Sequence, residues 1–333
     1  MRAAVWRQPG DLHVEDRSDP EPGPADVIVR VGACGMCGTD VHIAEGEFPP
    51  TPYPIVPGHE FAGEVVAVGP DVRELSVGAQ VAVDPSLFCG HCDFCRVQRG
   101  NLCSNWGAIG DTVDGAFAQL VRAPARNAYK LPEGTSMRVG ALVEPLACAV
   151  HGVRRLEPGP GDSVLITGAG TMGLLLVQLL LRDGAARVVV VDRNEQRLKI
   201  ASSLGASAVA TSVAAASEHD RDFDAVVDAT GVPEVVQQGI DAVRRGGKMM
   251  IFGVAPEDAR VSLSPFRVYN DEITLIGSMA VLFTFQPALE LLRAGAIALE
   301  PLLTHTFPLD EFGQALDTMR RGEGVKVQVL PNE

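Results

Sequence analysis

The stretch Ser163-Val-Leu-Ile-Thr-Gly-Ala-Gly-Thr-Met-Gly173 decides the fold of this chain. It opens with a short, mostly apolar run and continues with glycines in the pattern G-x-G-x-x-G. A strand, this glycine turn and a helix, in that order, are typical of a dinucleotide-binding unit. Gly168 is expected to make the turn, Gly170 to let a pyrophosphate approach the backbone, and Gly173 to let helix and strand pack closely.

Strands and helices alternate on the C-terminal side of this turn. Apolar runs predict strands at Ser163–Thr167, Arg187–Asp192, Ala208–Thr211, Phe223–Asp228, Lys248–Phe252 and Ile273–Ser278. Helical patterns lie between them, at Met172–Arg182, Glu195–Leu204 and Val232–Arg244. The alternation predicts a doubly wound parallel sheet with helices on both faces, the Rossmann arrangement.

A carboxylate ends the second of these strands. Asp192 lies nineteen residues after Gly173, where it would accept hydrogen bonds from the ribose hydroxyls of the adenosine. A carboxylate at this position repels a 2′-phosphate, so the sequence favours NAD over NADP. The neighbouring Arg193 leaves three alternatives open, because its guanidinium could bind a phosphate, stack on adenine or lie solvated in the loop.

The N-terminal part of the chain has a different composition and pattern of apolar residues. Residues 1–140 are rich in glycine and proline, and their short Val-rich runs predict an antiparallel β domain. These runs are Val27–Val31, Gly63–Val68, Gln80–Val83 and Ala116–Val121. Beyond Phe285 we expect two helices and a strand, at Pro287–Ala294, Leu309–Arg321 and Val325–Leu330, in a tail that packs back on another domain.

The charge balance narrows the class of ligand. The 333 residues include 28 basic and 42 acidic ones, a net charge of −14, which argues against nucleic-acid and anionic-membrane partners. The apolar stretch Leu174–Leu181 is too short for a membrane span, and no signal-peptide pattern opens the sequence. We therefore expect a cytoplasmic protein with a small-molecule ligand. Structural disulfides are disfavoured there, so the seven cysteines need another explanation.

Four of the cysteines lie close together in the sequence: Cys89, Cys92, Cys95 and Cys103. At this spacing four thiolates can converge on one tetrahedral zinc ion, in a closed structural site that leaves no position for a substrate. The zinc would hold together a loop with too few apolar residues to fold alone. An iron–sulfur cluster and four unrelated buried cysteines are the alternatives. The lack of the usual Cys-Pro context favours zinc over the cluster.

Three further motifs combine cysteine, histidine and carboxylate. They are Cys37-Gly-Thr-Asp-Val-His42, Gly58-His-Glu60 and Val143-Glu-Pro-Leu-Ala-Cys148. A mixed ligand set of this kind leaves one position open for water or substrate, as a catalytic zinc requires. Glu144 and Cys148 would share a face of a helix, and on spacing alone either could supply the third or fourth ligand.

These motifs, together with the dinucleotide turn and the returning tail, resemble the zinc-dependent medium-chain dehydrogenases of the alcohol dehydrogenase superfamily. The Glu144-Pro-Leu motif is most similar to the sorbitol, arabinitol and threonine dehydrogenase branch. The resemblance covers the whole chain and implies an α/β protein with a GroES-like β-rich catalytic domain and a Rossmann dinucleotide-binding domain. The implied domains are residues 1–147, with the structural-zinc lobe at 89–103, then 148–280, and a returning segment, 281–333, that completes the catalytic domain.

The resemblance also implies roles for individual residues. The ligands of the catalytic zinc would be Cys37, His59 and Glu60. Glu144 would be a direct or water-bridged fourth ligand, and Cys148, one helical turn away, would be either a competing ligand or a small packing residue. The Thr39 hydroxyl would take the proton of the substrate and His42 would pass it to solvent, although Glu60 or Glu144 could handle the proton instead. Close to the cofactor the resemblance adds Met172, Arg197, Thr230 and Gly253.

The implied activity is zinc-dependent hydride transfer between a secondary alcohol and NAD. The preferred substrate is a polyol or sugar alcohol. Each chain would hold two zinc ions. L-threonine and an aminocyclitol are alternative substrates. A zinc-stabilised, NAD-binding protein with a sensor or structural role is the alternative of another class. Several related enzymes pair the last strand of the dinucleotide sheet across a dimer axis. Ile273–Ser278 therefore predicts a homo-oligomer, a dimer or tetramer, unless the tail of the chain covers this strand.

Overall fold

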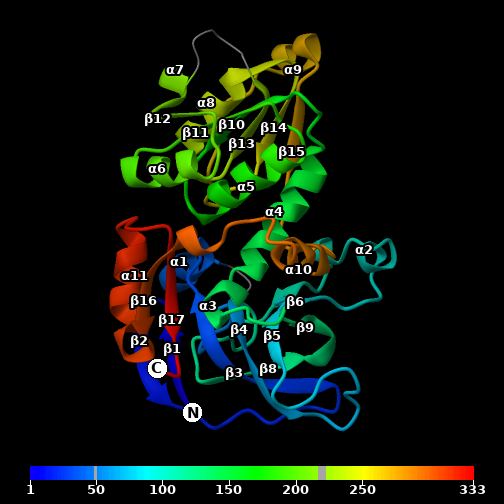
Figure 1. Cartoon of the computed structure of the whole chain (residues 1–333), viewed down its shortest axis with the longest axis vertical. Helices are drawn as coiled ribbons and strands as arrows, with labels where there is room; N and C mark the ends of the chain where they lie inside the picture. The colour runs from blue at the N-terminus through cyan, green and yellow to red at the C-terminus, as the bar shows by residue number, and fades with distance from the viewer. Residues whose placement is uncertain (49–50, 217–222) are drawn as a thin grey trace. The chain divides into compact units, whose positions relative to one another are not determined.

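The computed structural model describes residues 1–48, 51–216 and 223–333. The chain divides into two units, one of Met1–Ala147 with Val281–Glu333 and the other of Cys148–Ala280 (Figure 1). Helix α4 (Val143–Leu156) begins in the first unit and continues into the second. None of the described helices combines the length and the apolar character that a membrane span needs.

The second unit is built on a six-stranded parallel sheet. Its strands lie in the order β12-β11-β10-β13-β14-β15, the 3-2-1-4-5-6 order of doubly wound dinucleotide-binding folds. They are β10 (Ser163–Thr167), β11 (Arg187–Val191), β12 (Ala208–Ala210), β13 (Phe223–Asp228), β14 (Val243–Ile251) and β15 (Thr274–Gly277). Successive residues of the central strands are buried on both faces, which is why these strands are continuous apolar runs.

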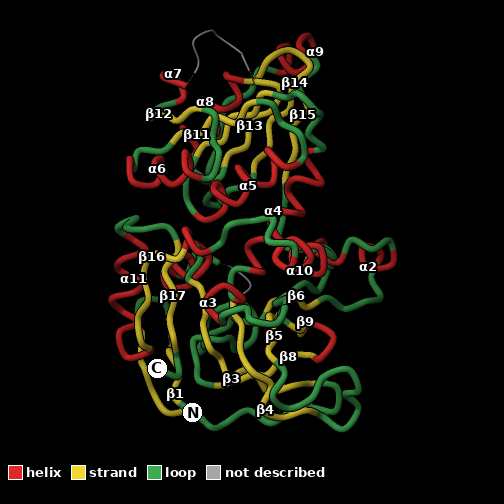
Figure 2. Tube along the Cα trace, in the orientation of Figure 1, coloured by secondary structure: helices red, strands yellow, loops and turns green. Residues whose placement is uncertain are grey.

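The helices of this unit pack against the strands that flank them in the sequence (Figure 2). They are α5 (Thr171–Arg182), α6 (Glu195–Ser203), α7 (Val213–Ala216), α8 (Pro233–Ala242) and α9 (Pro265–Asp271). The prediction of one helix over Val232–Arg244 is wrong at its C-terminal end. Val243 is extended and pairs with Phe223, because pairing in the sheet outweighs the local helical pattern.

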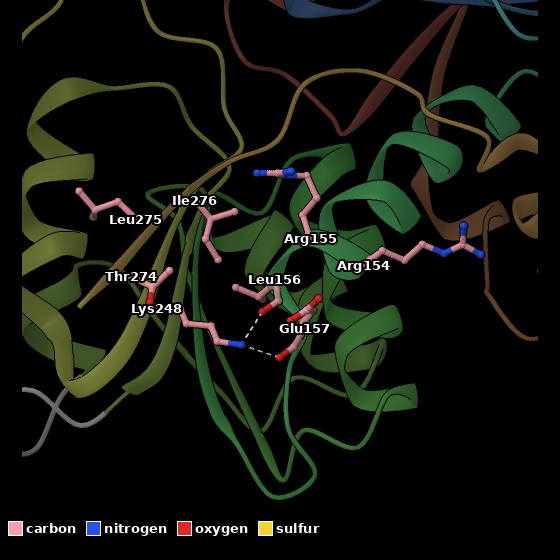
Figure 3. Close-up of a pocket in the computed structure, with 8 residues that line it drawn as sticks. All are labelled: Arg154, Arg155, Leu156, Glu157, Lys248, Thr274, Leu275 and Ile276. Atoms are coloured by element: carbon pink, nitrogen blue, oxygen red, sulfur yellow. Dashed lines mark hydrogen bonds between the residues drawn. The ribbon is translucent and has the colours of Figure 1, made fainter. Parts of the chain in front are cut away.

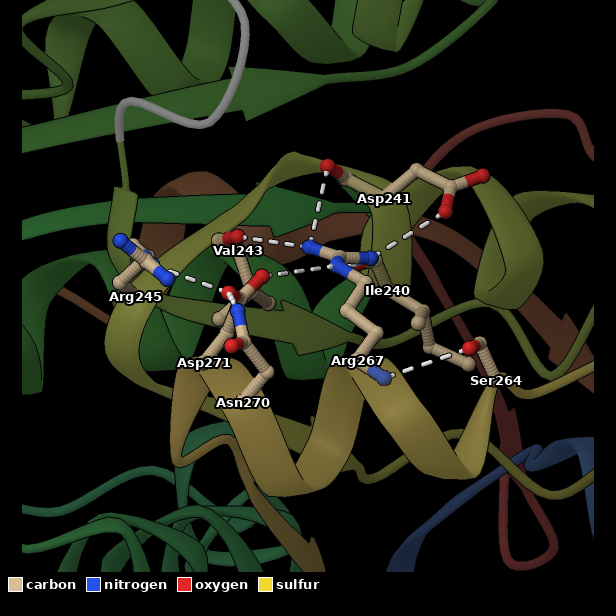
Figure 4. Close-up of polar contacts among 8 residues, drawn as sticks. All are labelled: Ile240, Asp241, Val243, Arg245, Ser264, Arg267, Asn270 and Asp271. Carbon is tan, nitrogen blue, oxygen red and sulfur yellow. Dashed lines mark hydrogen bonds and ion pairs between the residues drawn. The ribbon is translucent and has the colours of Figure 1, made fainter.

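A nearly buried arginine holds the end of α8. Arg267, on α9, donates from Nη1 to the carbonyl of Ile240 at 2.7 Å and from Nη2 to the carbonyl of Val243 at 2.8 Å (Figure 4). Its side chain is 13% exposed, and Asp271 on the same helix lies 3.6 Å from its Nε. The last carbonyls of a helix lack intrahelical donors, so the guanidinium satisfies them and ties α9 to α8.

A lysine plays the same part at the end of α4. Lys248 Nζ donates to the carbonyls of Leu156 at 2.8 Å and Glu157 at 2.7 Å (Figure 3). Beside this cap lies a pocket of about 560 Å³. Its other lining residues are Arg154, Arg155, Thr274, Leu275 and Ile276. The pocket therefore runs along β15, the last strand of the sheet.

The first unit is built on a seven-stranded sheet that uses both ends of the chain. The strand order is β16-β17-β3-β4-β5-β9, and β8 also pairs with β3. The strands are β3 (Asp26–Gly35), β4 (Glu60–Val68), β5 (Gln80–Val83), β8 (Leu120–Pro124), β9 (Ala128–Lys130), β16 (Leu303–Pro308) and β17 (Lys326–Leu330). Phe117 and Phe312 meet in its core with ring centroids 4.8 Å apart, so the C-terminal segment completes the same core.

Shorter elements surround this sheet. The strands β1 (Arg2–Gln8) and β2 (Asp11–Asp16) form a hairpin, and β6 (Ser86–Leu87) and β7 (Gly107–Ala108) pair at the base of the loop that carries the four cysteines. The helices are α1 (Gly38–Glu45), α2 (Asp93–Arg96), α3 (Met137–Gly140), α10 (Phe285–Arg293) and α11 (Phe312–Arg320).

The strand predicted at Ala116–Val121 begins later, at Leu120. Ala116 and Phe117 instead donate their N–H groups to the carbonyls of Gly58 and Pro57, at 2.9 and 3.0 Å. Because these bonds join the segment to the loop before His59, they help to place one of the predicted zinc ligands.

Candidate active site

One cysteine, one histidine and one carboxylate come together in the first unit. The ligand atoms of Cys37, His59 and Glu60, which we call the mixed cluster, all lie within 4.8 Å of one another. His59 and Glu60 are 7% and 2% exposed. Thiolate sulfur, imidazole nitrogen and carboxylate oxygen are ligands that zinc accepts, and three of them leave a fourth position open. The mixed cluster therefore fits a catalytic zinc ion.

The start of α1 places Cys37. This cysteine is the N-cap residue, and its backbone N–H donates to the carboxylate of Asp40 at 2.8 Å. Asp40 is fully buried, and burial raises its pKa to about 7. The hydrogen bond closes the first turn of the helix and fixes the backbone that carries the thiol.

A second carboxylate faces the imidazole of His59. Asp111 Oδ1 lies 3.2 Å from His59 Nδ1, both side chains are 8% exposed, and the buried Nδ1 makes no hydrogen bond of good geometry. Burial lowers the pKa of His59, but Asp111 and the Cys37 thiol raise it by more, so the net direction is upward. A carboxylate that faces one ring nitrogen favours a proton on that nitrogen and leaves the other nitrogen available to bind a metal, which strengthens the fit.

The carboxylate of Glu60 already has a partner in the protein. Lys326 Nζ, on β17, donates to Glu60 Oε2 at 2.5 Å and to the Met36 carbonyl at 2.8 Å. Burial would lower the pKa of Lys326, but the charges of Glu60 and Cys37 raise it by more. The lysine is therefore a buried cation beside the mixed cluster.

The predicted fourth ligand lies on α4, which is helical as expected. Glu144 is 8% exposed, and its charge also contributes to the raised pKa of Lys326. Neither Glu144 nor Cys148 belongs to the mixed cluster as the structure draws it. The roles predicted for these two residues stay predictions.

The residues of the predicted proton path lie on α1. Thr39 Oγ1 is 3.9 Å from Cys37 Sγ, and Thr39 and His42 are three residues apart, on one face of the helix. His42 Nδ1 lies 2.9 Å from Glu47 Oε2, and the side chains of His42 and Glu47 are 26% and 54% exposed. The side chains of the predicted path thus share one face of α1, and the last of them meets the exposed Glu47, while the path itself stays a prediction.

The four cysteines of the lobe (residues 89–103) also converge. Their sulfur atoms lie within 4.8 Å of one another, and the lobe cysteines form no disulfide. The backbone N–H groups of Cys89 and Asn105 donate to Cys103 Sγ, each at 3.3 Å. Those of Cys95 and Ser104 lower the pKa of Cys92 to about 6. N–H donors stabilise thiolates, the form that binds zinc, so the lobe fits a closed structural zinc site.

The glycine turn has the geometry that a dinucleotide needs. A side chain on Gly173 would place its Cβ 1.8 Å from the Gly168 carbonyl oxygen, so only glycine allows this approach of α5 to the turn. Gly170, the N-cap of α5, has open space where a Cβ would lie. Met172 follows in the first turn of α5 and is half-buried. A pyrophosphate can thus reach the N-terminus of the helix.

The predicted ribose ligand is held in place by the backbone. Asp192 Oδ2 accepts the N–H of Ala169 and Oδ1 that of Asn194, both at 2.7 Å. Arg193 beside it is exposed, and Arg197 on α6 is half-buried. The carboxylate therefore lies beside the glycine turn with a fixed orientation.

A buried aspartate ties the strand ends at this edge together. Asp228 is fully buried and accepts hydrogen bonds from the hydroxyls of Thr167 and Thr230, at 3.0 and 2.6 Å, and from the N–H of Gly231 at 3.0 Å. Its carbonyl accepts the N–H of Gly253 at 2.8 Å. Thr230 and Gly253, predicted from the resemblance to lie near the cofactor, thus join the edge that carries the glycine turn.

Comparison with known proteins gives the family. Residues 23–133 match the family model of the alcohol dehydrogenase GroES-like domain, and residues 171–294 match that of the zinc-binding dehydrogenases. A D-arabinitol dehydrogenase of Uromyces fabae is 36% identical over 342 residues, covering 100% of this chain and 97% of its own length. The chain belongs to the zinc-binding alcohol dehydrogenase family.

Other relatives of this dehydrogenase support the same family assignment. An L-threonine 3-dehydrogenase of Shewanella woodyi is 34% identical over 98% of both chains. The crystal structure of a zinc-binding dehydrogenase of Sinorhizobium meliloti, bound to NADP, superimposes with a TM-score of 0.93 at 37% identity and 99% coverage of both chains. The predicted family branch, fold class and oxidoreductase activity are confirmed.

Several residues that position the site of this dehydrogenase were not predicted from the sequence. They are Asp40, Glu47, Asp111 and Lys326. Two of them carry a local signal. Asp40 stands at the position of a capping box, and Lys326 is a lone charge within an apolar strand. Asp111 reaches His59 from a distant turn, and no pattern in the sequence predicts that contact.

Proposed function

We propose that this dehydrogenase oxidises a secondary hydroxyl group of a polyol, with NAD as the hydride acceptor. The observation that carries the proposal is that one chain holds both the mixed cluster and the dinucleotide turn. When bound by Cys37, His59 and Glu60, zinc would polarise the substrate hydroxyl and stabilise the negative charge that develops on its oxygen. The similarity to a D-arabinitol dehydrogenase over the whole chain supports a polyol as substrate.

The residues of α1 provide the route for the proton. Oxidation of the alcohol transfers a hydride from the carbinol carbon to the nicotinamide and releases the hydroxyl proton. The Thr39 hydroxyl accepts this proton and His42 carries it to Glu47 and solvent, in line with the 2.9 Å between His42 and Glu47. Glu60 or Glu144 is the alternative proton acceptor.

Asp192 supports NAD over NADP. Both of its oxygens are oriented by backbone N–H groups, so the carboxylate cannot turn away from a 2′-phosphate without losing these bonds. The Sinorhizobium meliloti protein is bound to NADP, and in this chain Arg193 is exposed next to Asp192. We expect the charge repulsion to dominate, because two backbone N–H groups hold the Asp192 carboxylate beside the glycine turn, whereas the Arg193 side chain is exposed.

A panel of alcohols tests the proposal. We expect D-arabinitol or another polyol to give the highest kcat/KM, with NAD at least about tenfold better than NADP, a difference of about 1.4 kcal/mol. The measurement is the formation of reduced cofactor with polyols, L-threonine and aminocyclitols, with and without a zinc chelator. Highest activity on L-threonine would contradict the polyol proposal. Cofactor binding without turnover on any substrate would instead favour a sensor or structural role.

We further propose a homo-oligomer built on β15. Among the described residues this strand pairs with β14 alone, and Leu275 is 44% exposed. On α9, which directly precedes β15 in the chain, Phe266 and Tyr269 are 71% and 82% exposed. An open edge beside exposed aromatic side chains is suited to pairing with a second copy across a twofold axis.

A charged side chain on the edge tests the oligomer. We expect the Leu275→Lys variant to sediment as a monomer and the unaltered chain as a dimer or tetramer, because lysines on edge strands oppose pairing. Val77→Lys is the matched control, since Val77 is an exposed apolar residue, 60% exposed, in the other unit. Sedimentation equilibrium gives the masses. A monomeric unaltered chain would contradict the proposal.

A further inference from the structure

The pocket along β15 is lined by cations although the protein is strongly acidic. Its lining includes Arg154, Arg155 and Lys248, and one acidic residue, Glu157. These side chains carry a charge of 3 − 1 = +2, in a chain whose net charge is −14. All of the lining residues belong to the second unit. The pocket is therefore a local region of positive charge that has no part in the mixed cluster or the dinucleotide turn.

The two arginines of the pocket have no ion-pair partner. Arg244 and Arg245, in the same unit, each form an ion pair with an aspartate. Within residues 1–48, 51–216 and 223–333, no carboxylate forms an ion pair or a hydrogen bond with Arg154 or Arg155. Burial, and then the charges of Arg155 and Arg154, lower the pKa of His151 on the same helix. Their positive charge thus acts on their surroundings without a partner to neutralise it.

These arginines are not needed to cap α4. Cations are favoured in the last turn of a helix, but Lys248 Nζ already donates to the carbonyls of Leu156 and Glu157 (Figure 3). Arg155 Nε donates instead to the carbonyl of Gly277, at the end of β15, at 2.7 Å. This bond holds the guanidinium beside the strand and leaves both terminal nitrogens without a protein acceptor in the described structure. The arginines are thus available to a ligand.

We propose that this pocket binds the phosphoryl group of a small molecule. A phosphate monoester carries close to two negative charges at neutral pH, which matches the pocket charge of +2. The N–H groups of a guanidinium fit two phosphate oxygens at once.

The shape of the pocket favours a phosphorylated metabolite over the bare ion. Arg154 and Arg155 leave the last turn of α4 in different directions, so their charges are spread out (Figure 3). The volume of about 560 Å³ is that of a small-molecule pocket and exceeds what one phosphate ion fills. A sugar phosphate is therefore the expected class of ligand, and free phosphate is the other source of the same chemistry.

The inference depends neither on the proposed activity nor on the proposed oligomer, because one chain supplies every lining residue. A second copy paired across β15 would bring its own Arg155 and Lys248 to the same edge, since the same surface of both copies meets at a twofold axis. Pairing would therefore add positive charge beside the pocket and favour an anion there.

Calorimetric titration of the protein saturated with NADH is the decisive measurement. NADH fills the dinucleotide site, so phosphate cannot bind at the glycine turn, and no oxidised cofactor is present to oxidise a hydroxyl. The probes are D-glucose 6-phosphate, inorganic phosphate and the neutral D-glucose, at constant ionic strength. We expect the sugar phosphate to bind at least about tenfold more tightly than glucose. Equal binding of inorganic phosphate would support the site with free phosphate as its ligand. Binding of neither phosphate would overturn the inference.

Charge variants tie the binding to the pocket. Joint replacement by Arg154→Gln and Arg155→Gln should weaken sugar phosphate binding at least about tenfold, because two charged donors are lost. Glu157→Gln removes the acidic residue of the lining and should tighten binding about threefold, a gain that a general loss of structure would not produce. Arg182→Gln is the matched control, since Arg182 is an exposed arginine in the last turn of α5, outside the pocket. Unchanged affinity in the double variant, or an equal loss in Arg182→Gln, would overturn the inference.

The single variant Arg154→Gln keeps the inference testable if loss of the bond between Arg155 and Gly277 disturbs the fold. The Arg154 side chain makes no hydrogen bond to the described residues, so its replacement should leave the thermal unfolding temperature unchanged. It should still weaken sugar phosphate binding about threefold or more, while turnover of a polyol without added phosphate stays the same. A folded Arg154→Gln variant that binds the sugar phosphate as tightly as the unaltered chain would overturn the inference.

Discussion

Replacing Cys37 by alanine is expected to empty the zinc site of the mixed cluster and to lower turnover by about a thousandfold or more. A bound metal contributes several kcal/mol of transition-state stabilisation to the developing charge on the substrate oxygen, and each ~1.4 kcal/mol is a factor of ten in rate. The fold should survive, because the bond from the backbone N–H of Cys37 to the Asp40 carboxylate remains in the variant. Metal analysis and steady-state kinetics measure the two effects.

Cys34→Ala is the matched control for this result. Cys34 is a fully buried thiol three residues away that lies outside the mixed cluster, so its loss should leave the metal content unchanged. Thr39→Ala separates metal binding from proton transfer, since it should keep the zinc and still lose turnover by about a hundredfold. A Cys37→Ala variant that retains its zinc would contradict the ligand assignment, and undiminished turnover of Thr39→Ala would move the proton path to Glu60 or Glu144.

The fold could be predicted largely because one local pattern constrains it. Gly168, Gly170 and Gly173 after an apolar strand admit few backbone arrangements, and the alternation that follows gives a parallel sheet. The ends of elements were less predictable. Val243 has the pattern of a helix residue, yet it pairs in the sheet, and the carbonyls before it are satisfied by Arg267 from a later helix. Arg267 lies more than twenty residues after these carbonyls, so the sequence around them does not predict the contact.

In the candidate site too, local motifs could be predicted and contacts between distant segments could not. Cys37, His59 and Glu60 could be predicted because ligand types are few and their motifs are short. Their partners come from distant segments: Asp111 faces His59 from a turn, and Lys326 reaches Glu60 from the C-terminal strand. A buried lysine among valines indicates that a partner exists but does not say which carboxylate it is. Only the pairing of β17 with β3 decides this.

The other large effect is expected in the lobe, where a zinc ion held by the four cysteines would take the place of a hydrophobic core. Helix α2 has no buried residue, and the apolar side chains of Phe94 and Val97 are 42% and 65% exposed. Little apolar burial is therefore available to hold residues 89–103. Structural zinc sites contribute about 10–16 kcal/mol of apparent binding free energy in isolated zinc fingers, which is folding free energy for such a loop.

Cys92→Ser should therefore release about one zinc per chain and unfold the lobe locally, while the mixed cluster keeps its metal. Trypsin then cleaves after the exposed Arg96 or Arg99 at least about tenfold faster than in the unaltered chain, since each ~1.4 kcal/mol of lost local stability raises the open population tenfold. The control is His91→Ala, an exposed side chain of the same loop that is not a ligand. Unchanged cleavage in Cys92→Ser, or equal cleavage in both variants, would mean that the lobe is held by its polypeptide contacts and not by the metal.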